Sequence, residues 1–354
     1  MKLECLEKLD PVTRKEWDTF VYNSKNQHPR QFPVFAEIER AEGNYPYFII
    51  GRENGHICAA ALVSRVPHKY LKGKYSCATI LSGPICDDAR QLSEFVSGLK
   101  NERFFDNVGR INISPYWLGR DSCEAQNVLA EIGFVSAERS SLRKTGLVDL
   151  DRPEQEILAS FSKSARREAR RAERMDVRVT MLSEKEDFFT FLKILNQLRK
   201  SRQLTIFEKN PMAFSFDTFY KYGDHGVVLC AWHEETLLAG LQIYRSKNTA
   251  HGRHFAGDND ELKNLKNLRI SPLLWLEGMK WAKKKGCTHL DLEGYDASVS
   301  KENSHYFIYK YKGEFSPKEI TRVAEHYFVT NPIYNFPGYL APKLKGYIKG
   351  ILNK

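Results

Sequence analysis

The sequence lacks the features of disulfide-stabilised, zinc-binding and membrane-spanning proteins. Its seven cysteines are an odd number, they are scattered, and no two of them form a CxxC pair. This argues against a disulfide framework and against a zinc site. No apolar run approaches the ~20 residues that a membrane-spanning helix needs, and the polar N-terminus MKLECLEKLD has no signal-peptide core. We therefore expect a cytoplasmic protein.

Several catalytic motifs are missing as well. The sequence contains no P-loop, no GxSxG nucleophile elbow and no cluster of residues with metal-ligand spacing. We therefore expect chemistry that needs neither a serine or cysteine nucleophile nor a bound metal, and we expect no resident cofactor.

What is present is a globular composition with a basic charge balance. The chain has 354 residues, of which 42% are hydrophobic and 28% charged, which suits two domains with separate cores. The formal net charge of +10 indicates an acidic partner such as nucleic acid, a phosphate-bearing nucleotide or an anionic membrane.

One pattern of elements occurs twice at an offset of roughly 180 residues. Tyr47–Pro67 reads as a strand, a short polar turn and a strand, and Val227–Ser246 repeats that pattern. The order continues in parallel with a helix, a strand and a short closing segment. The matched pairs are Gln91–Arg103 with Ser271–Lys285, Arg110–Ser114 with His289–Glu293, and AEIGF ending at Phe134 with YKGEF ending at Phe315. A repeat of this length indicates a duplicated domain.

We predict two α/β domains and a tail. Residues 1–150 form the first domain, ending in a closing strand at Leu142–Leu150, and residues 151–330 form the second, ending in a strand at Ile320–Val329. Alternating strands and helices with one long hairpin per copy predict mixed sheets covered by helices. This layout resembles two tandem GNAT-like (acyl-CoA N-acyltransferase-like) domains, and we expect a ligand cleft between them.

A strongly basic helix opens the second domain. Phe161–Arg174 (FSKSARREARRAER) places its arginines on two adjoining faces, and Ser162 or Ser164 can cap its start. Arginine donates in a planar fork that matches phosphate oxygens, although a solvated face paired with glutamates explains the charge equally well.

Four segments of the sequence resemble the Fem family of peptidyltransferases, which add amino acids from aminoacyl-tRNA to peptidoglycan precursors. The resemblance lies in LVDL followed by FSKSARREARRAER, in LSGPI (Leu81–Ile85), in LDLEG (Leu290–Gly294) and in YKGEFS (Tyr311–Ser316). It covers roughly residues 30–330. Tyr311 and Ser316 depart from the family's Phe and Gly, and no long coiled-coil arm interrupts the second domain.

The resemblance implies site residues for transfer of an acyl group to an amine. Lys312 stands at the family's motif lysine, which is thought to stabilise the tetrahedral intermediate or to position the acyl carbonyl. Asp291 and Glu293 alternate along one strand and are candidate bases, although neutralisation of nearby cations explains them equally well. The family's diphosphate anchor lies in the region of the basic helix, where four residues are candidates for binding the substrate's phosphates: Lys163, Arg166, Arg167 and Arg170.

The acyl donor stays open between aminoacyl-tRNA and acyl-CoA. Where CoA-dependent enzymes place a glycine-rich phosphate loop, this chain reads RISPLL (Arg269–Leu274), and side chains and Pro272 would crowd a backbone cradle. The sequence therefore favours aminoacyl-tRNA as the donor.

The acceptor expected from the resemblance is an amine of a nucleotide- or lipid-linked cell-envelope precursor, such as a peptidoglycan peptide. One alternative is an acyl-CoA-dependent N-acyltransferase of an exopolysaccharide or nucleotide-sugar pathway. Another is a non-catalytic protein that binds RNA or membrane. The tail over residues 331–354 ends in a basic amphipathic segment, Tyr339–Lys354, which suits either packing on the protein or peripheral contact with the inner face of the membrane.

Overall fold

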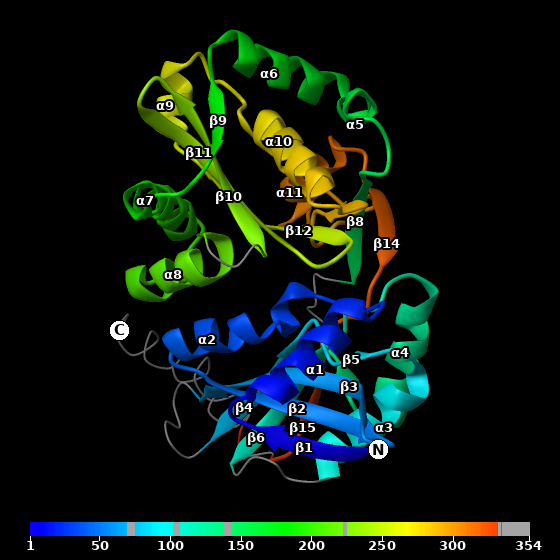
Figure 1. Ribbon diagram of the computed structural model, residues 1–354. Coiled ribbons are helices and arrows are strands. Elements are labelled where there is room, and N and C mark those ends of the chain that lie inside the picture. The colour runs from blue at the N-terminus through cyan, green and yellow to red at the C-terminus, as the bar shows by residue number, and fades with distance from the viewer. Residues whose placement is uncertain (69–74, 102–106, 138–142, 222–224, 332–333, 335–354) are drawn as a thin grey trace, which may run out of the picture. The chain divides into compact units, whose positions relative to one another are not determined.

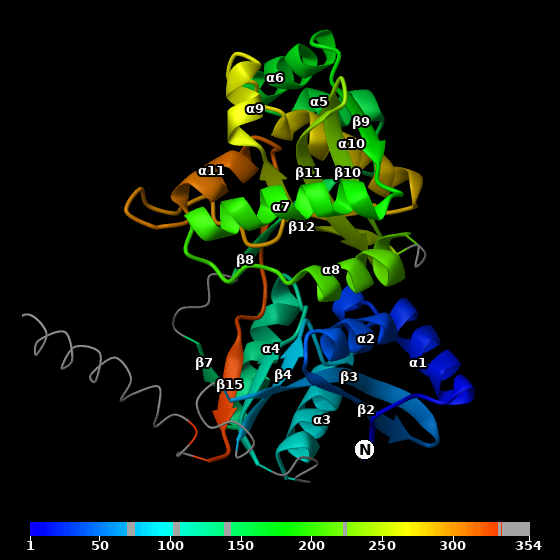
Figure 2. The same cartoon turned by 90° about the vertical axis from the view of Figure 1, so that its left-hand side faces the viewer.

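A computed structural model describes the chain except for residues 69–74, 102–106, 138–142, 222–224, 332–333 and 335–354. The chain forms two compact units (Figures 1 and 2). The first unit combines Met1–Ser140 with Val323–Lys354, and the second is the continuous stretch Ser141–Arg322. The predicted tail segment Tyr339–Lys354 lies outside the described residues.

The first unit is built on a mixed sheet with the strand order β1-β2-β3-β4-β6-β15-β7, and β5 pairs with β3. The strands are β1 (Lys2–Leu6), β2 (Tyr45–Glu53), β3 (His56–Pro67), β4 (Ser76–Leu81), β5 (Ile85–Cys86), β6 (Val108–Ser114), β7 (Val135–Ser136) and β15 (His326–Val329). The helices are α1 (Pro11–Asn23), η1 (Pro29–Gln31), α2 (Pro33–Ala41), α3 (Ala89–Asn101) and α4 (Arg120–Glu131).

Local sequence sets these elements. The carboxylate of Asp10 accepts hydrogen bonds from the backbone N–H groups of Val12 and Thr13, and Pro11 occupies the first helical turn, so α1 begins there. The β2–β3 hairpin turns through Asn54 and Gly55, both at positive φ, as a two-residue turn requires.

The second unit repeats this plan with the strand order β9-β10-β11-β12-β13-β8-β14. Its strands are β8 (Lys144–Asp149), β9 (Arg178–Met181), β10 (Gly226–His233), β11 (Thr236–Arg245), β12 (Thr249–Gly257), β13 (His289–Asp291) and β14 (Lys318–Thr321). Its helices are α5 (Glu154–Ser160), α6 (Lys163–Arg174), α7 (Lys185–Ser201), α8 (Lys209–Ser215), η2 (Phe216–Lys221), α9 (Asn259–Asn264), α10 (Ser271–Lys284) and α11 (Tyr306–Gly313).

The second sheet has helices on both faces. Leu241 and Ile243 of β11 lie against Gly278 of α10, where a methyl group on the glycine would collide with Ile243. Gly240, which points to the opposite face of β11, lies against Phe191 of α7. Helices α10 and α7 are accordingly drawn on opposite sides of β10 and β11 in Figure 1. The duplicated α/β layout expected from the repeat is therefore confirmed.

The predicted closing strands need a correction. Leu142–Leu150 was expected to close the first domain, but β8 pairs with β13 and β14 in the second sheet. The expected strand Ile320–Val329 is divided: Lys318–Thr321 pairs with β8, and His326–Val329 pairs with β6 and β7 of the first sheet. The last strand of each repeat therefore occupies the sixth position in the other repeat's sheet, and the chain divides near residues 140 and 322 instead of at 150.

Within the described residues, none of the helices combines the length and the apolar character that crossing a bilayer requires.

Candidate active site

The two parallel strands at the centre of the second sheet separate early. Strands β12 and β13 pair only over the three positions from Thr249↔His289 to His251↔Asp291. Beyond His251, β12 continues to Gly257 along β11, while the chain after β13 turns away. The side of β12 that faces β13 is therefore open from Gly252 onward.

A β-bulge lies at this point of divergence. The register between β11 and β12 shifts, so that Gln242 pairs with His254 and Ile243 with Gly252, which leaves Arg253 as the extra residue. Gly252 is required there, because a Cβ atom would lie 2.3 Å from Cη2 of Trp275. The glycine lets the α10 tryptophan approach the bulged backbone closely.

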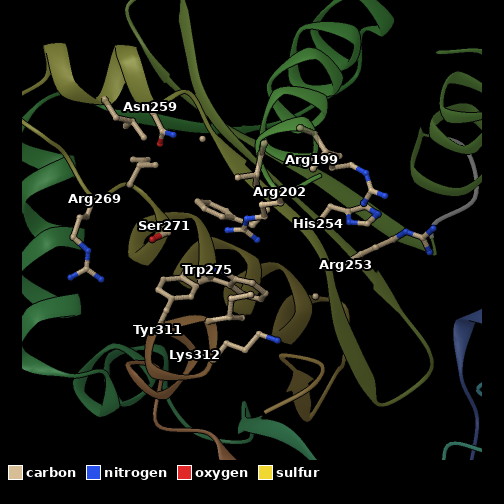
Figure 3. A pocket seen from close by; sticks show the side chains of 18 of the residues that line it. Arg199, Arg202, Arg253, His254, Asn259, Arg269, Ser271, Trp275, Tyr311 and Lys312 are labelled. Carbon is tan, nitrogen blue, oxygen red and sulfur yellow. The ribbon is translucent and has the colours of Figure 1, made fainter. Parts of the chain in front are cut away.

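The separated strands border a cavity of about 770 Å³ that lies within the second unit. This volume falls in the range of small-molecule sites, which runs from about 300 to 1,000 Å³. Helix α7 with the segment after it, the C-terminal half of β12, α9, the start of α10 and α11 all contribute to its wall (Figure 3).

Cationic side chains and one imidazole gather around this cavity from separate parts of the chain. They are Arg199, Arg202, Arg253, His254, Lys263 and Arg269. The Arg199 Nε donates to the carbonyl oxygen of Thr205 at 2.5 Å, its guanidinium lies 4.0 Å from the ring centroid of Phe207, and burial lowers its pKa. Arg269 donates to the Ser164 hydroxyl at 3.1 Å and to the Glu314 carboxylate at 2.5 Å. A wall with this charge suits an anionic, phosphate-bearing ligand.

Lys312 lies in the cavity wall, on the last turn of α11. Its ammonium donates hydrogen bonds to the carbonyl oxygens of Glu293 at 2.5 Å and Gly294 at 2.9 Å. An ammonium group has three N–H donors, so one more is available to a ligand. Burial lowers the pKa of Lys312 to about 8, against the attraction of the Glu293 and Asp291 carboxylates. The side chain is thus a donor whose charge changes just above neutral pH.

Glu293 also lines the cavity, next to Lys312. Its backbone adopts a left-handed conformation (φ +57°), which its N–H stabilises by donating to Asp291 Oδ1 at 2.7 Å. Its carboxylate is 24% exposed and accepts a hydrogen bond from Arg322 Nη1 at 3.2 Å. The His251 Nδ1 lies 3.4 Å from the same carboxylate. Glu293 is therefore a partly accessible carboxylate held by a buried arginine.

Asp291 has a different environment from Glu293. It is fully buried and accepts hydrogen bonds from the Thr145 hydroxyl and the Glu293 N–H. It holds the turn that presents Glu293, and the residues that line the cavity include Glu293 but not Asp291. The structure thus brings Lys312, Asp291 and Glu293 together, with two of them at the cavity.

The four residues predicted on the basic helix lie elsewhere. Arg166 donates to the carbonyl oxygens of Ala159 and Phe161, both at 2.6 Å, and so satisfies the end of α5. Arg167 is 73% exposed and pairs with Glu168, while Lys163 and Arg170 are exposed. Among the described residues, the cavity lining includes none of the four. Ser162 caps α6 by accepting from Ala165 N, as one of the two predicted alternatives.

The sequence analysis missed the arginines of the cavity wall. Arg199 and Arg202 stand in a short basic run, RKSR, at the end of one helix, but Arg253 lies inside a strand and Arg269 precedes another helix, so nothing in the sequence joins the three places into one site. A further signal is Gly252, because a glycine inside a strand indicates a bulge or a close backbone approach.

Comparisons with known proteins agree with this architecture. Residues 159–312 match the family model described as an acetyltransferase (GNAT) domain. The crystal structure of FemX is similar over 95% of this chain and 99% of that one, with a TM-score of 0.78 at 17% identity. No curated protein sequence matches the chain.

Two other solved structures are similar at a lower level. A tandem GNAT protein from the clavulanic acid biosynthesis pathway covers 94% of this chain and 99% of its own, with a TM-score of 0.54 at 11% identity. The C-terminal domain of a putative lysylphosphatidylglycerol synthetase from Agrobacterium fabrum covers 90% and 92%, with a TM-score of 0.53 at 15% identity.

The chain therefore has the GNAT acyltransferase fold, in tandem. Within that class its architecture is Fem-like, and the resemblance carried by the sequence motifs is confirmed at the level of the fold.

Proposed function

We propose that this protein is an acyltransferase that moves an aminoacyl group from aminoacyl-tRNA to an amine of a cell-envelope precursor, such as a peptidoglycan peptide, at the inner face of the membrane. The observation that carries the proposal is a half-buried lysine, Lys312, in a cavity whose wall carries six cationic or imidazole side chains. The FemX-like fold and the Fem-like motifs support the choice of donor and acceptor.

The proposed reaction assigns a step to each group at the cavity. The acceptor amine gives a proton to the Glu293 carboxylate and attacks the acyl carbon, forming the C–N bond. Lys312 donates its remaining N–H to the developing oxyanion. The bond between the acyl carbon and the ribose oxygen then breaks, and that oxygen takes the proton held by Glu293, which restores the carboxylate. Arg322, 3.2 Å from Glu293, holds the carboxylate in place before the attack.

The wall arginines would anchor the phosphates of the donor, which fixes the acyl carbon near Lys312. We assign this role first to Arg202, which lines the cavity, because Arg199 and Arg269 already donate to protein oxygens and the Arg253 guanidinium lies over the Tyr244 ring. The four basic-helix residues Lys163, Arg166, Arg167 and Arg170 remain candidates for contact with a more distant part of a large donor such as tRNA.

Two other candidates have specific support. The match of residues 159–312 to an acetyltransferase model favours acyl-CoA as the donor of an N-acyl group. The name of the similar lysylphosphatidylglycerol synthetase domain describes a product in which an aminoacyl group is attached to a phospholipid. This favours a lipid-linked acceptor.

The test is a transfer assay with purified protein. Radiolabelled aminoacyl-tRNA and acetyl-CoA are each offered with a UDP-linked muropeptide, and amide formation is followed by mass spectrometry. Transfer from aminoacyl-tRNA that depends on Lys312 supports the proposal. Transfer from acetyl-CoA alone would show that the donor is acyl-CoA and not aminoacyl-tRNA. Salt-sensitive RNA binding without transfer would favour a non-catalytic binding protein.

A further inference from the structure

The cavity in the second unit is more apolar than the transfer of a very small acyl group requires. Apolar and aromatic side chains from five elements and their connections form much of its wall. They are Leu195, Leu198, Leu204, Phe255, Leu262, Leu268, Ile270, Trp275, Leu292, Ile308 and Tyr311. Phe255 and Tyr311 stack with their ring centroids 6.5 Å apart, and Trp275 packs on the bulged backbone at Gly252. The rings of Trp275 and Tyr311 border the cavity beside Lys312 (Figure 3).

One apolar side chain of this wall is left open to solvent. Leu204 follows α7 and is 50% exposed although it lines the cavity. The segment that carries it is fixed at both ends of the turn, because Asn196 Oδ1 accepts from Phe207 N at 2.8 Å and Arg199 donates to Thr205 O. Leu204 is therefore held over the cavity as an uncovered apolar surface.

We infer that the acyl group carried by the donor is bulky and apolar, of the size of a leucyl, phenylalanyl or medium-chain fatty acyl group. This inference rests on the proposed function and names the substrate class of the same site. In this arrangement the donor's phosphates lie at Arg202, the carbonyl lies at Lys312, and the apolar group covers Leu204 and the aromatic wall, all of which line the same cavity.

The size of the cavity supports this occupant. A glycyl or acetyl group would leave most of the apolar wall in contact with water, whereas a leucyl or phenylalanyl side chain would remove it from water. Burying such a side chain raises affinity by roughly tenfold to a hundredfold.

The experiment measures binding of matched pairs of stable donor analogues. One pair consists of RNA minihelices that carry glycine or phenylalanine through a 3′-amide, and the other of acetyl- and octanoyl-CoA thioethers. Titration calorimetry gives the dissociation constants for the native protein and two variants, Leu204→Ser and Ile206→Ser. Ile206 is the matched control, since it is 55% exposed two residues away and does not line the cavity.

Within the pair that binds, we expect the bulky analogue to bind at least ~10-fold more tightly than the small one. Leu204→Ser should reduce that ratio severalfold without changing the affinity for the small analogue, and Ile206→Ser should leave the ratio unchanged. Equal binding of bulky and small analogues overturns the inference and leaves the proposed function in place. Failure of both pairs to bind, with the unacylated RNA and CoA also failing, overturns the proposed function and the inference together.

Discussion

The same place in the two sheets is closed in the first unit and open in the second. In the first unit β4 and β6 pair over six positions, from Ser76↔Val108 to Leu81↔Ser114, whereas β12 and β13 of the second unit pair over three. Beside β3 and β4 the first unit has a hollow of only about 10 Å³, against about 770 Å³ at β12. A duplicated fold therefore keeps a ligand-sized cavity in one copy at this place and fills it in the other.

Gln31 fills this place in the first unit. After β4 the chain bends through Ser82 and the cis peptide bond between Gly83 and Pro84. The buried Gln31 side chain donates to the carbonyl oxygen of Leu81 at 2.7 Å and accepts from the N–H of Leu62 at 2.7 Å. A Cβ atom on Gly83 would lie 2.7 Å from the Gln31 amide, so only a glycine leaves room for this side chain, which we call the Gln31 plug. One side chain thus satisfies the backbone groups that the bend leaves without strand partners.

The first unit also lacks the charged groups that the second unit has at its cavity. By the repeat, Ser114 corresponds to Glu293, and Glu131 of α4 corresponds to Lys312. The first unit thus has a hydroxyl in place of the proposed base and a carboxylate in place of the proposed oxyanion donor. Under the proposed function, this difference places the transfer in the second unit and leaves a structural role for this part of the first.

Replacement of the lysine should have the largest effect. Lys312→Ala removes the proposed oxyanion donor, so kcat/KM for acyl transfer should fall by on the order of a hundredfold to a thousandfold. The melting temperature is measured alongside, because the substitution removes a desolvated charge but also removes the donor to the Glu293 and Gly294 carbonyl oxygens. Lys310→Ala, an exposed lysine on the same helix, is the control and should retain full activity. Equal activity of both variants would contradict the assignment of chemistry to the second unit.

Removal of the plug should affect stability without affecting catalysis. Gln31→Ala leaves the buried Leu62 N–H and Leu81 carbonyl oxygen unpaired, which should lower the free energy of unfolding by about 2 kcal/mol. Urea denaturation measures this loss, with Gln126→Ala on α4 as a control of the same chemical change. A change in the KM for the acyl donor would argue that this part of the first unit also binds substrate.

Substitution of two exposed arginines, one at the cavity and one on α6, tests which of these places binds the donor's phosphates. Arg202→Ala removes a side chain from the cavity, so the donor KM should rise about tenfold through loss of a charge-assisted hydrogen bond to phosphate. Arg170→Ala makes the same charge change on α6 and should alter the donor KM much less. The reverse order of effects would restore the basic helix as the main phosphate anchor.

The smallest expected effect is a pH dependence set by Lys312. Its pKa is lowered to about 8, so the donating ammonium is present below that pH and kcat/KM should decline as pH rises through it. Because the pKa is about 8 in the folded protein and 10.5 as the unperturbed value, the folded protein binds fewer protons between these pH values. Its free energy of unfolding should therefore rise with pH in that interval, relative to Lys312→Met. Activity that stays constant from pH 7 to 9 would contradict the role of Lys312.

The sequence predicted local elements better than their partners. The hairpins and the Ser162 cap depend on neighbouring residues, so turn and capping patterns were sufficient to find them. The partners of β8 and β15 were mispredicted, because a six-residue and a four-residue strand carry no information about which of two similar sheets they join.

The candidate site was predicted in part for the same reason. Lys312, Asp291 and Glu293 stand in recognisable motifs, and the structure brings them together. Arg202 and Arg253 lie far apart in the sequence, and only the separation of β12 from β13 places them at one cavity. The dense charge of α6 was conspicuous in the sequence, but Arg166 is used to satisfy the end of α5.

The position of β15 has a consequence for the order in which the protein is made. The second unit is one uninterrupted stretch that ends at Arg322, whereas the first unit needs β15 (His326–Val329) to separate β6 from β7. During synthesis on a ribosome, residues 1–140 therefore emerge before β15 is made, and their sheet stays incomplete until that strand is added. The later-made unit can complete its core before the earlier one, which reverses the usual N-terminal-first order of domain folding.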